Sequence, residues 1–360
     1  MRKFNDITAK EALKTAGLIS VAPFVFQAVK SMKDLGIMAA LADLSGGASL
    51  AKNELVQLTK ADDYTVSVLL DLAEAAEIVL KNENNTYNLS KIGMYLADDP
   101  MTTVNFDFTA EVCYRGLEDL TKSLKNHKPE GLKVFTAKEQ TIYPILSQLP
   151  EPARTSWFAF DHFYSDRVFE QALAYLFAPE RDFKIEHICD IGGNTGRFAL
   201  TACKAIPNLK VTIADLPEQC ALALEAVMQA GLVERISTWP LDILAPGTKL
   251  PTTPDLFWMS QFLDCFSRDQ VVFILRRVQE AMRPGAMLVI NEIFGDRQRN
   301  DTAKLIVEAN SLYFTALANG VSRFYHADEF LELAALAGLK PCGELNDLGM
   351  GHSLLLFKKV

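Results

Sequence analysis

The stretch "HICDIGGNTGRFAL", residues 187–200, decides the fold of this 360-residue chain. It begins as a short apolar run, turns at Gly192, Gly193 and Gly196, and continues with the apolar spacing of a helix. Glycines let the backbone bend sharply and approach a ligand, and the first turn of a helix has free N–H groups. The stretch therefore predicts a site for a nucleotide-like cofactor. Its spacing differs from the dinucleotide pattern, because Asn194 stands where a glycine would be required.

Further strands and helices alternate after this turn. The apolar runs that read as strands are "LKVTIADL" (209–216), "DLFWMSQF" (255–262), "AMLVINEIF" (286–294), "LKPCGELND" (339–347) and "HSLLLFKK" (352–359). Helical stretches such as "RDQVVFILRRVQEAM" (268–282) separate the first of them, which predicts a parallel α/β sheet with helices on both faces. The last two runs are joined by the short turn "LGMG", so they predict an antiparallel edge.

Carboxylates stand at the ends of successive predicted strands. Asp190 ends the first strand, Asp215 ends the second, and Asp242 in "WPLDIL" follows the next. Asp215 is placed to accept hydrogen bonds from ribose hydroxyls, and Asp242 could accept from an adenine amino group. One such residue alone could be a loop carboxylate. Three in order indicate a cofactor site.

The N-terminal part, residues 1–100, has a different pattern. It reads as helices with breaks at "LSGGAS" (44–49) and "TKADD" (59–63), followed by the strand pair "IVLK" (78–81) and "TYNLS" (86–90). This order of elements predicts a winged helix-turn-helix, a module that can bind DNA through its third helix.

The charge of the third helix argues against DNA as a partner. "DDYTVSVLLDLAEAAEI" (62–78) has five acidic residues and no Lys or Arg, and the whole chain carries a formal charge of -9. Its apolar face and "LISVAPFVFQAV" (18–29) fit dimerisation better. The second run is interrupted by Pro23 and is shorter than the roughly 20 residues of a membrane span. We expect no nucleic acid or membrane partner.

Two patterns that are missing from the sequence bear on the cell compartment of the protein and on metal binding. The N-terminal residues lack the apolar core of a secretory signal, so we expect a cytoplasmic protein. The six cysteines are scattered without a C-x-x-C pair, which predicts reduced thiols and no metal site.

Residues 101–179 read as long connecting helices, among them "TIYPILSQL" (141–149) and "TSWFAFDHFYSDRVFEQALAYLF" (155–177). An aromatic stripe at helical spacing is usually core, but His162 and Tyr164 add polar groups that could face a substrate pocket. The sequence thus predicts three regions: 1–100, 101–179 and a cofactor-binding domain at 180–360.

A family resemblance rests on several of these motifs. "DIGGNTGRFA", "ADLP", "PLDIL", "MRPGAMLVINEIF" and "HSLLLF" resemble class I S-adenosylmethionine-dependent methyltransferases of the caffeate and hydroxyindole O-methyltransferase type. The resemblance covers nearly the whole chain and implies a Rossmann-like sheet with an antiparallel C-terminal edge, an N-terminal winged-helix dimerisation domain and a homodimer. It implies that the cofactor is held at its methionine end by Asp190, Gly192, Gly193 and Gly196, at its ribose by Asp215 with Leu216, and at its adenine by Asp242, Ile243 and Phe266.

The chain departs from that family in "MSQFLDCFSR" (259–268). The family has a histidine as general base in a pattern like Leu-His-Asp-Trp-Ser, and Asp264 occupies the histidine's position. Glu292 matches one of the two acids that flank that histidine, and the other position falls near Phe324. A cofactor-contacting lysine of plant members falls at Ser260.

Three interpretations of Asp264 remain open. It could be the base for O-methylation of a small phenolic acceptor, if burial and Glu292 raise its pKa. It could orient a phenol whose ring carbon is methylated, which fits a second resemblance of "SQFLDCFS" and "FDHFYSD" to methyltransferases that accompany aryl polyene pigment synthesis. It could also be structural, in a cofactor-binding scaffold or regulator without catalysis. His326 and His352 are possible replacement bases.

Overall fold

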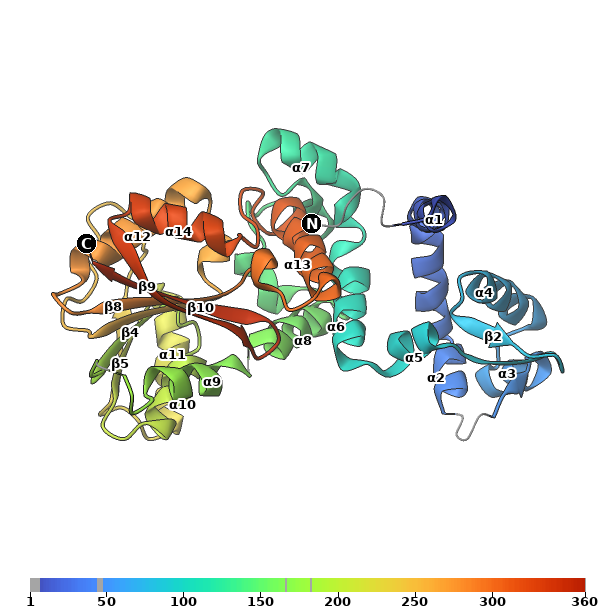
Figure 1. Ribbon diagram of the computed structural model, residues 1–360, viewed down its shortest axis with the longest axis horizontal. Coiled ribbons are helices and arrows are strands. Elements are labelled where there is room, and N and C mark those ends of the chain that lie inside the picture. The colour runs from blue at the N-terminus through green and yellow to red at the C-terminus, as the bar shows by residue number, and fades with distance from the viewer. Residues whose placement is uncertain (1–6, 44–47, 166, 182, 360) are drawn as a thin grey trace. The chain divides into compact units, whose positions relative to one another are not determined.

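The computed structural model describes residues 7–43, 48–165, 167–181 and 183–359. It divides the chain into two compact units, Met1–Ala110 and Glu111–Val360. The blue part of Figure 1 belongs to the first unit, and the green to red parts belong to the second. Each unit has its own apolar core.

The first unit has the winged-helix order of elements. Its helices are α1 (Ala9–Asp34), α2 (Ile37–Ala42), α3 (Lys52–Thr59), α4 (Asp63–Ala75), α5 (Lys91–Asp98) and α6 (Pro100–Phe108), and its strands are β1 (Leu50–Ala51), β2 (Val79–Lys81) and β3 (Thr86–Leu89). The predicted hairpin is β2 and β3, which lie antiparallel. The short β1 adds a third strand on the other side of β3 and was not predicted. Residues 44–47 of the predicted break at 44–49 lie outside the described residues.

Local sequence explains where the helices of this unit begin. The Asp62 side chain accepts a hydrogen bond from the backbone N–H of Thr65 and so caps α4. Thr8 and Glu11 form a reciprocal capping box at the start of α1. Behind the caps, Leu55 and Leu70 are fully buried and join the helices in one core.

Helix α1 leaves most of its apolar surface uncovered. Leu13, Ile19 and Phe24 are 75%, 69% and 72% exposed. The helix continues through Pro23, which interrupts the apolar sequence but not the helix. By length and composition alone α1 could cross a membrane, and only 6% of its apolar window is buried. An exposed apolar helix of this length calls for a partner surface.

The second unit is built on a seven-stranded sheet in the order β6-β5-β4-β7-β8-β10-β9. The strands are β4 (His187–Ile191), β5 (Lys210–Asp215), β6 (Ile236–Pro240), β7 (Leu256–Ser260), β8 (Met287–Ile293), β9 (Leu339–Leu348) and β10 (His352–Lys359). Strands β4 to β8 pair in parallel, whereas β10 is antiparallel to both β8 and β9. The predicted parallel sheet with an antiparallel edge is confirmed.

Helices cover both faces of this sheet (Figure 1). They are α9 (Val168–Leu176), α10 (Arg197–Ala205), α11 (Pro217–Gln229), α12 (Arg268–Ala281) and α14 (Ala327–Leu336). Two further helices of this unit, α8 (Ala153–Ser165) and α13 (Asp301–Tyr313), lie beside the sheet. Apolar side chains of α12 and α14 share one core with β7 and β8, and those of α9, α10 and α11 form a second core on the other face. The parallel strands are therefore buried on both sides, as their continuous apolar sequences predict.

The region between the N-terminal unit and β4 differs from the prediction of long helices. It contains short elements: η1 (Thr109–Cys113), η2 (Gly116–Asp119), α7 (Leu120–Asn126), η3 (Glu130–Val134) and η4 (Tyr143–Gln148). The segment 155–177, predicted as one helix, is divided between α8 and α9. Pro144 lies in the first turn of η4 and Pro150 follows its end, and both lack the N–H that a longer helix would need. The assignment of residues 101–179 to a separate connecting region stays a prediction.

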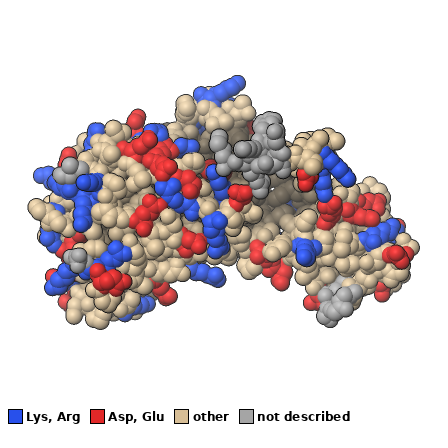
Figure 2. Space-filling view, in the orientation of Figure 1, with Lys and Arg blue, Asp and Glu red and all other residues tan. Residues whose placement is uncertain are grey.

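The surface of the second unit has mixed charge. On the face shown in Figure 2, basic and acidic side chains of the described residues are interspersed over this unit. This mixture leaves no extended region of one charge on that face. Nucleic-acid binding requires an extended positive region.

Candidate active site

The topology of the sheet sets the place of the site. Strand β4 has β5 on one side and β7 on the other, so the strand order reverses between β4 and β7. Ligands of open α/β sheets bind at such a reversal, beyond the carboxyl ends of the strands. The glycine turn follows β4, and η5 (Leu263–Cys265) follows β7. The two segments singled out in the sequence thus meet at the same edge.

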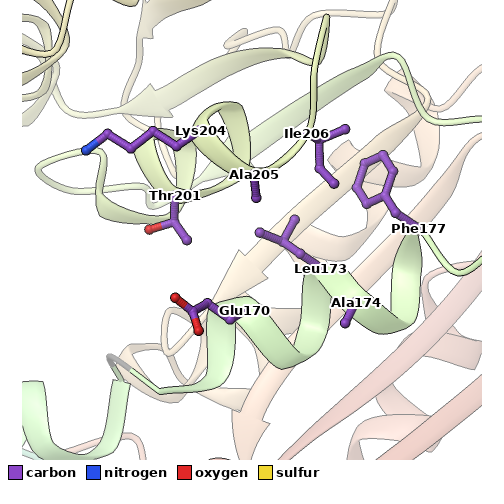
Figure 3. A pocket seen from close by; sticks show the side chains of 8 residues that line it. All are labelled: Glu170, Leu173, Ala174, Phe177, Thr201, Lys204, Ala205 and Ile206. Atoms are coloured by element: carbon purple, nitrogen blue, oxygen red, sulfur yellow. The ribbon is translucent and has the colours of Figure 1, made fainter.

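A surface hollow of about 630 Å³ lies elsewhere, between α9 and α10 (Figure 3). It is lined by Glu170, Leu173, Ala174, Phe177, Thr201, Lys204, Ala205 and Ile206. Most of these residues lie toward the C-terminal ends of both helices, whereas the glycine turn leads into the N-terminus of α10. The hollow is therefore not the cofactor site.

Asp190 is the most informative residue of the glycine turn. It is 2% exposed, and its Oδ2 atom has no hydrogen-bond partner in the described structure. A Cβ atom on Gly193 would stand 2.6 Å from that oxygen, so glycine is required there. Burial, together with the charge of Asp215, raises the pKa of Asp190 to about 8. A buried carboxylate without a partner is costly, and a ligand that donates hydrogen bonds would remove that cost.

The rest of the turn is held tightly. Gly192 has a φ of +73°, and a Cβ atom on it would come within 2.2 Å of the Phe262 ring. Gly196 has a φ of +79° and precedes α10. Asn194 also has a positive φ, and its N–H donates to Asp215 Oδ2 at 2.8 Å. The glycine turn is thereby tied to the ends of both β5 and β7.

The residues predicted to contact ribose and adenine follow β5 and β6. Asp215 accepts a second hydrogen bond from the Leu216 N–H at 2.7 Å, and burial raises the pKa of Asp215 against these two donors. Asp242 is exposed and accepts from the Leu244 N–H. Ile243 is buried, and its carbonyl accepts from the Arg277 guanidinium at 2.9 Å. The backbone at Ile243 is therefore fixed from α12.

Two aromatic rings lie beside the glycine turn. Phe266 packs edge to face on Phe262, with 4.9 Å between the ring centroids. The Phe266 carbonyl accepts a hydrogen bond from the Tyr325 hydroxyl at 2.7 Å. The sequence pointed to Phe266 but not to Phe262, because only the folded chain shows that the Phe262 ring lies against Gly192.

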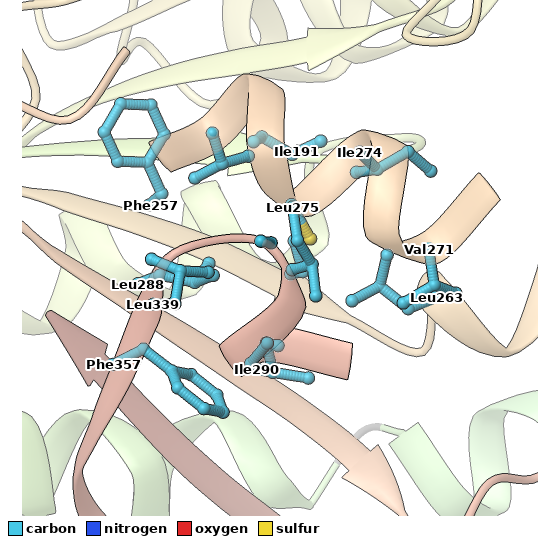
Figure 4. Packing of buried hydrophobic residues seen from close by; sticks show 14 of the residues in the cluster. Ile191, Phe257, Leu263, Val271, Ile274, Leu275, Leu288, Ile290, Leu339 and Phe357 are labelled. Atoms are coloured by element: carbon cyan, nitrogen blue, oxygen red, sulfur yellow. The ribbon is translucent and has the colours of Figure 1, made fainter. Parts of the chain in front are cut away.

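Asp264 lies in η5 and is 6% exposed. Burial raises its pKa to about 7; the Cys265 thiol, which donates to Asp264 Oδ1 at 3.4 Å, opposes that rise, and the charge of Asp161 adds to it. Leu263, one residue earlier, is buried against Val271 of α12 (Figure 4). This contact anchors the η5 turn to α12.

Glu292 lies on the neighbouring strand β8 and is 2% exposed. Its Oε1 atom accepts from the N–H groups of Phe262 and Leu263 at 3.0 and 2.9 Å, whereas Oε2 has no partner in the described structure. Burial raises the pKa of Glu292 well above its usual range, and the charge of Asp264 raises it further. Glu292 therefore fixes the turn that carries Asp264 and favours one shared negative charge over two.

Sequence reasoning missed the polar side chains that come near η5 from distant segments. Asn319 Nδ2 donates to the Tyr143 hydroxyl at 3.1 Å and to the Cys265 carbonyl at 3.0 Å. Trp157 Nε1 donates to the Tyr313 hydroxyl at 2.8 Å. The partners in each pair are far apart in the chain, so no spacing in the sequence could have related them.

The two residues predicted for a substrate pocket differ in position. His162 is exposed on α8, and its Nδ1 lies 2.6 Å from Arg197 Nη1 at the start of α10. Tyr164 is 5% exposed and packs against Phe160 and Phe163. The structure brings His162 next to the glycine turn and Tyr164 into an aromatic cluster, and a contact of either with substrate stays a prediction.

The structure also shows the surroundings of the two alternative bases and of the two other positions that were taken from the family. His326 Nε2 lies 2.7 Å from Glu308 Oε1. His352 is fully buried at the start of β10, and burial lowers its pKa to about 3, so its ring is neutral. Ser260 accepts a hydrogen bond from Asn291 of β8, and Phe324 packs on Phe314. Among the described residues no cluster of possible metal ligands occurs.

Comparison with known proteins decides the family. An O-methyltransferase domain matches residues 176–340, and a Dimerisation2-like domain matches residues 13–87. The chain carries an O-methyltransferase domain and a Dimerisation2-like domain. This methyltransferase is S-adenosylmethionine-dependent, and its N-terminal unit is the helical dimerisation domain of the family.

Individual relatives of this methyltransferase act on aromatic compounds. The L-tyrosine C(3)-methyltransferase of Streptomyces lavendulae is 23% identical over 93% of this chain and 89% of its own length. The 3-hydroxy-5-methyl-1-naphthoate 3-O-methyltransferase of Streptomyces sahachiroi is 29% identical, but the match spans 45% of this chain and only 44% of the relative. The S-adenosylmethionine-dependent methyltransferase SibL, solved in its apo form, has the same fold, with a TM-score of 0.72 at 20% identity over 96% of this chain and 99% of SibL.

Proposed function

We propose that this methyltransferase transfers a methyl group to the hydroxyl of a small phenolic acceptor in secondary metabolism, with Asp264 as the general base. One observation carries the proposal: a buried carboxyl with a pKa of about 7 lies at the end of β7, beside the glycine turn. The relative that is named as a naphthoate 3-O-methyltransferase supports the same class of acceptor.

The cofactor residues fit S-adenosylmethionine. The unpartnered Asp190 Oδ2 and the glycines at 192, 193 and 196 suit its charged methionine end, since an ammonium group would pair with the carboxylate. Asp215 with Leu216 would hold the ribose. Asp242, Ile243 and Phe266 would hold the adenine. When bound, the cofactor supplies an electrophilic methyl group on a positively charged sulfur.

Asp264 is suited to take a proton from the acceptor. A phenol has a pKa near ~10, and a base with a pKa of about 7 is a closer match than an ordinary carboxylate near ~4. The carboxylate accepts the phenolic proton as the oxygen becomes nucleophilic. Glu292 holds the η5 turn through the N–H groups of Phe262 and Leu263, so the carboxylate stays in one place while the proton moves.

Two measurements on the purified protein test the proposal. Calorimetric titration with S-adenosylhomocysteine should give saturable binding in the micromolar range. Incubation with S-adenosylmethionine and a panel of hydroxylated aromatic acids should then release S-adenosylhomocysteine with at least one acceptor. Binding without turnover on any member of a broad panel would favour the scaffold or regulator interpretation, and no binding would contradict the cofactor assignment itself.

Ring carbon methylation is the second candidate, because the relative with the longest match of those reported is an L-tyrosine C(3)-methyltransferase. In this case Asp264 would hold the phenol hydroxyl while the carbon beside it takes the methyl group as the sulfur–methyl bond breaks. The proton of that carbon would then pass to water, which restores the aromatic ring. The acceptor could be a 4-hydroxyphenyl acid or its thioester. Proton NMR of the product separates the two candidates, because C-methylation keeps the free phenol and removes one aromatic proton.

The assembly is proposed to be a cytoplasmic homodimer formed through the N-terminal unit. The Dimerisation2-like domain match includes most of α1, whose apolar side chains are exposed in the single chain. A second copy would cover this surface with the same surface of its own. Neither a nucleic acid nor a membrane is proposed as a partner.

A further inference from the structure

A series of hydrogen bonds leads to Asp264 from outside its own turn. Asn319 Nδ2 shares its two protons among three acceptors: the Tyr143 oxygen at 3.1 Å, the Cys265 carbonyl at 3.0 Å and Ser322 Oγ at 2.7 Å. The Tyr143 hydroxyl donates to Cys265 Sγ. The Cys265 thiol donates to Asp264 Oδ1 at 3.4 Å. The three successive bonds from Asn319 to Asp264 run in the same direction, toward the carboxylate.

The direction is fixed at each step by the chemistry of the groups. Asn319 Oδ1 already accepts from the N–H groups of Val321 and Ser322, so its amide can only donate toward Tyr143. Burial raises the pKa of Tyr143 well above its usual range, so its oxygen keeps the proton that it donates to sulfur. Burial, together with the charge of Asp264, does the same for the Cys265 thiol. Successive donors in a buried network strengthen one another.

We propose that Asn319, Tyr143 and Cys265 form a directed hydrogen-bond relay that orients the Asp264 carboxylate and stabilises its negative charge. The inference rests on the proposed function in that Asp264 is the base. The three relay members are positioning residues. Because the thiol occupies Oδ1, the relay leaves Oδ2 as the oxygen that takes the acceptor's proton.

The other groups near Asp264 explain why its carboxylate needs a hydrogen-bond donor. Asp161 of α8 and Glu292 of β8 carry carboxyls whose charges disfavour a charged Asp264. Tyr325 is also near, but its hydroxyl donates to the Phe266 carbonyl. Among the side chains named here, the Cys265 thiol is the one that favours the charged form.

The relay can be observed without any turnover. The S–H stretching band of Cys265 is obtained as the infrared difference between wild-type protein and Cys265→Ala. In the relay this band lies at the low frequency of a donating thiol. We expect it to move to higher frequency in Asp264→Leu, which removes the acceptor, and by a smaller amount in Tyr143→Phe, which removes the donor to sulfur. A band at the frequency of a free thiol in the wild type would overturn the relay.

Kinetics tests whether the relay acts on Asp264. Cys265→Ala should move the acid limb of the rate profile upward by about half a pH unit, which lowers kcat about 3-fold on that limb with little change in KM. Cys265→Ser keeps a donor and should restore the limb. An unmoved limb in Cys265→Ala, with the band where the relay predicts, would overturn the charge-stabilising role.

Cys203→Ala is the matched control. Cys203 is another buried thiol that donates at 3.4 Å, but its acceptor is the Leu209 carbonyl at the other end of α10. Its substitution should leave the acid limb unchanged, which separates the relay from a general loss of packing. If the wild type binds its cofactor but methylates no phenol, the proposed function fails, and the infrared band still decides whether the relay exists.

Discussion

Burial and hydrogen bonding act in opposite directions on the carboxyl of Asp264. Burial raises its pKa to about 7, and the thiol of Cys265 limits that rise. An unperturbed histidine has a pKa near ~6.5. The burial of Asp264 thus gives a carboxylate the proton affinity of an imidazole.

Asp264→Asn tests the role of this residue directly. The amide has nearly the same size but cannot take a proton, so we expect kcat to fall at least ~100-fold. Affinity for S-adenosylhomocysteine, measured by calorimetry, should change little, since the residues proposed to hold the cofactor are elsewhere. Turnover equal to that of the wild type would exclude both catalytic roles of Asp264.

The pH dependence of turnover follows from the same pKa. A general base must be ionised, so the rate should rise with pH through about 7 and level off above it. The measurement is kcat/KM from pH 5.5 to 9 with saturating cofactor. The limb should be absent from the residual activity of Asp264→Asn. An acid limb near ~4 would mean that Asp264 titrates as an ordinary exposed carboxyl.

Gly192 is the residue at which steric limits are sharpest. Gly192→Ala would place a Cβ atom 2.2 Å from the Phe262 ring at a φ of +73°. Either the ring or the turn must move, and we expect affinity for S-adenosylhomocysteine to fall at least ~10-fold. Gly285→Ala is the matched control, because Gly285 has a φ of +85° with nothing within 4 Å. Equal loss of affinity in both variants would point to a general backbone effect.

Among the elements, those with a clear apolar period were predictable. The predicted runs "HICDI" and "HSLLLFKK" coincide with β4 and β10. They were recognisable because strands buried on both faces are continuously apolar. The connecting region was not predictable in the same way. Residues 141–149 and 155–177 have helical composition, but prolines and tertiary packing decide where each short helix ends.

The same difference separates the site residues that could be found from the sequence from those that could not. Asp190 and Asp215 were found because a parallel sheet places the carboxyl ends of its strands at one edge. Tyr143 and Asn319 were not found, because η4 and the turn after η7 (Phe314–Ala318) meet only through tertiary contacts. Topology can be read from periodic sequence. Contacts between irregular segments cannot.

The apolar surface of helix α1 is expected to form the dimer interface. Replacement of Leu13, Ile19 and Phe24 by Gln should convert a dimer to a monomer in light scattering, because these side chains are exposed and apolar in the single chain. Leu336→Gln on α14 is the control, since that leucine is 62% exposed in the second unit. A dimer that survives the triple substitution would place the interface elsewhere.

At the scale of the whole molecule, the second unit buries several carboxyls at one edge of its sheet. Asp190, Asp264 and Glu292 are each at most 6% exposed, and burial raises the pKa of all three. An inert scaffold would be more stable with apolar or amide side chains in these positions. The cost in stability is understandable if the cofactor and the acceptor supply the missing partners.

This cost predicts how stability depends on pH. The pKa of Asp190 is about 8 in the folded chain and near ~4 in an unfolded one, so between these values the folded state binds the extra proton. The contribution is fully present below pH ~4 and is lost as pH rises through about 8. The thermal midpoint should therefore fall from pH 5 to pH 8.5.

Asp190→Asn isolates the residue in that experiment. The amide carries no charge at any pH, so the variant should lose part of the slope and exceed the wild type at pH 8.5 by ~2 kcal/mol in the free energy of unfolding. Added S-adenosylhomocysteine should stabilise the wild type most at high pH, where Asp190 is charged and unpartnered without a ligand. Parallel pH curves for variant and wild type would show that Asp190 is already ionised in the folded chain, and its proposed contact with the ammonium group would lose its physical basis.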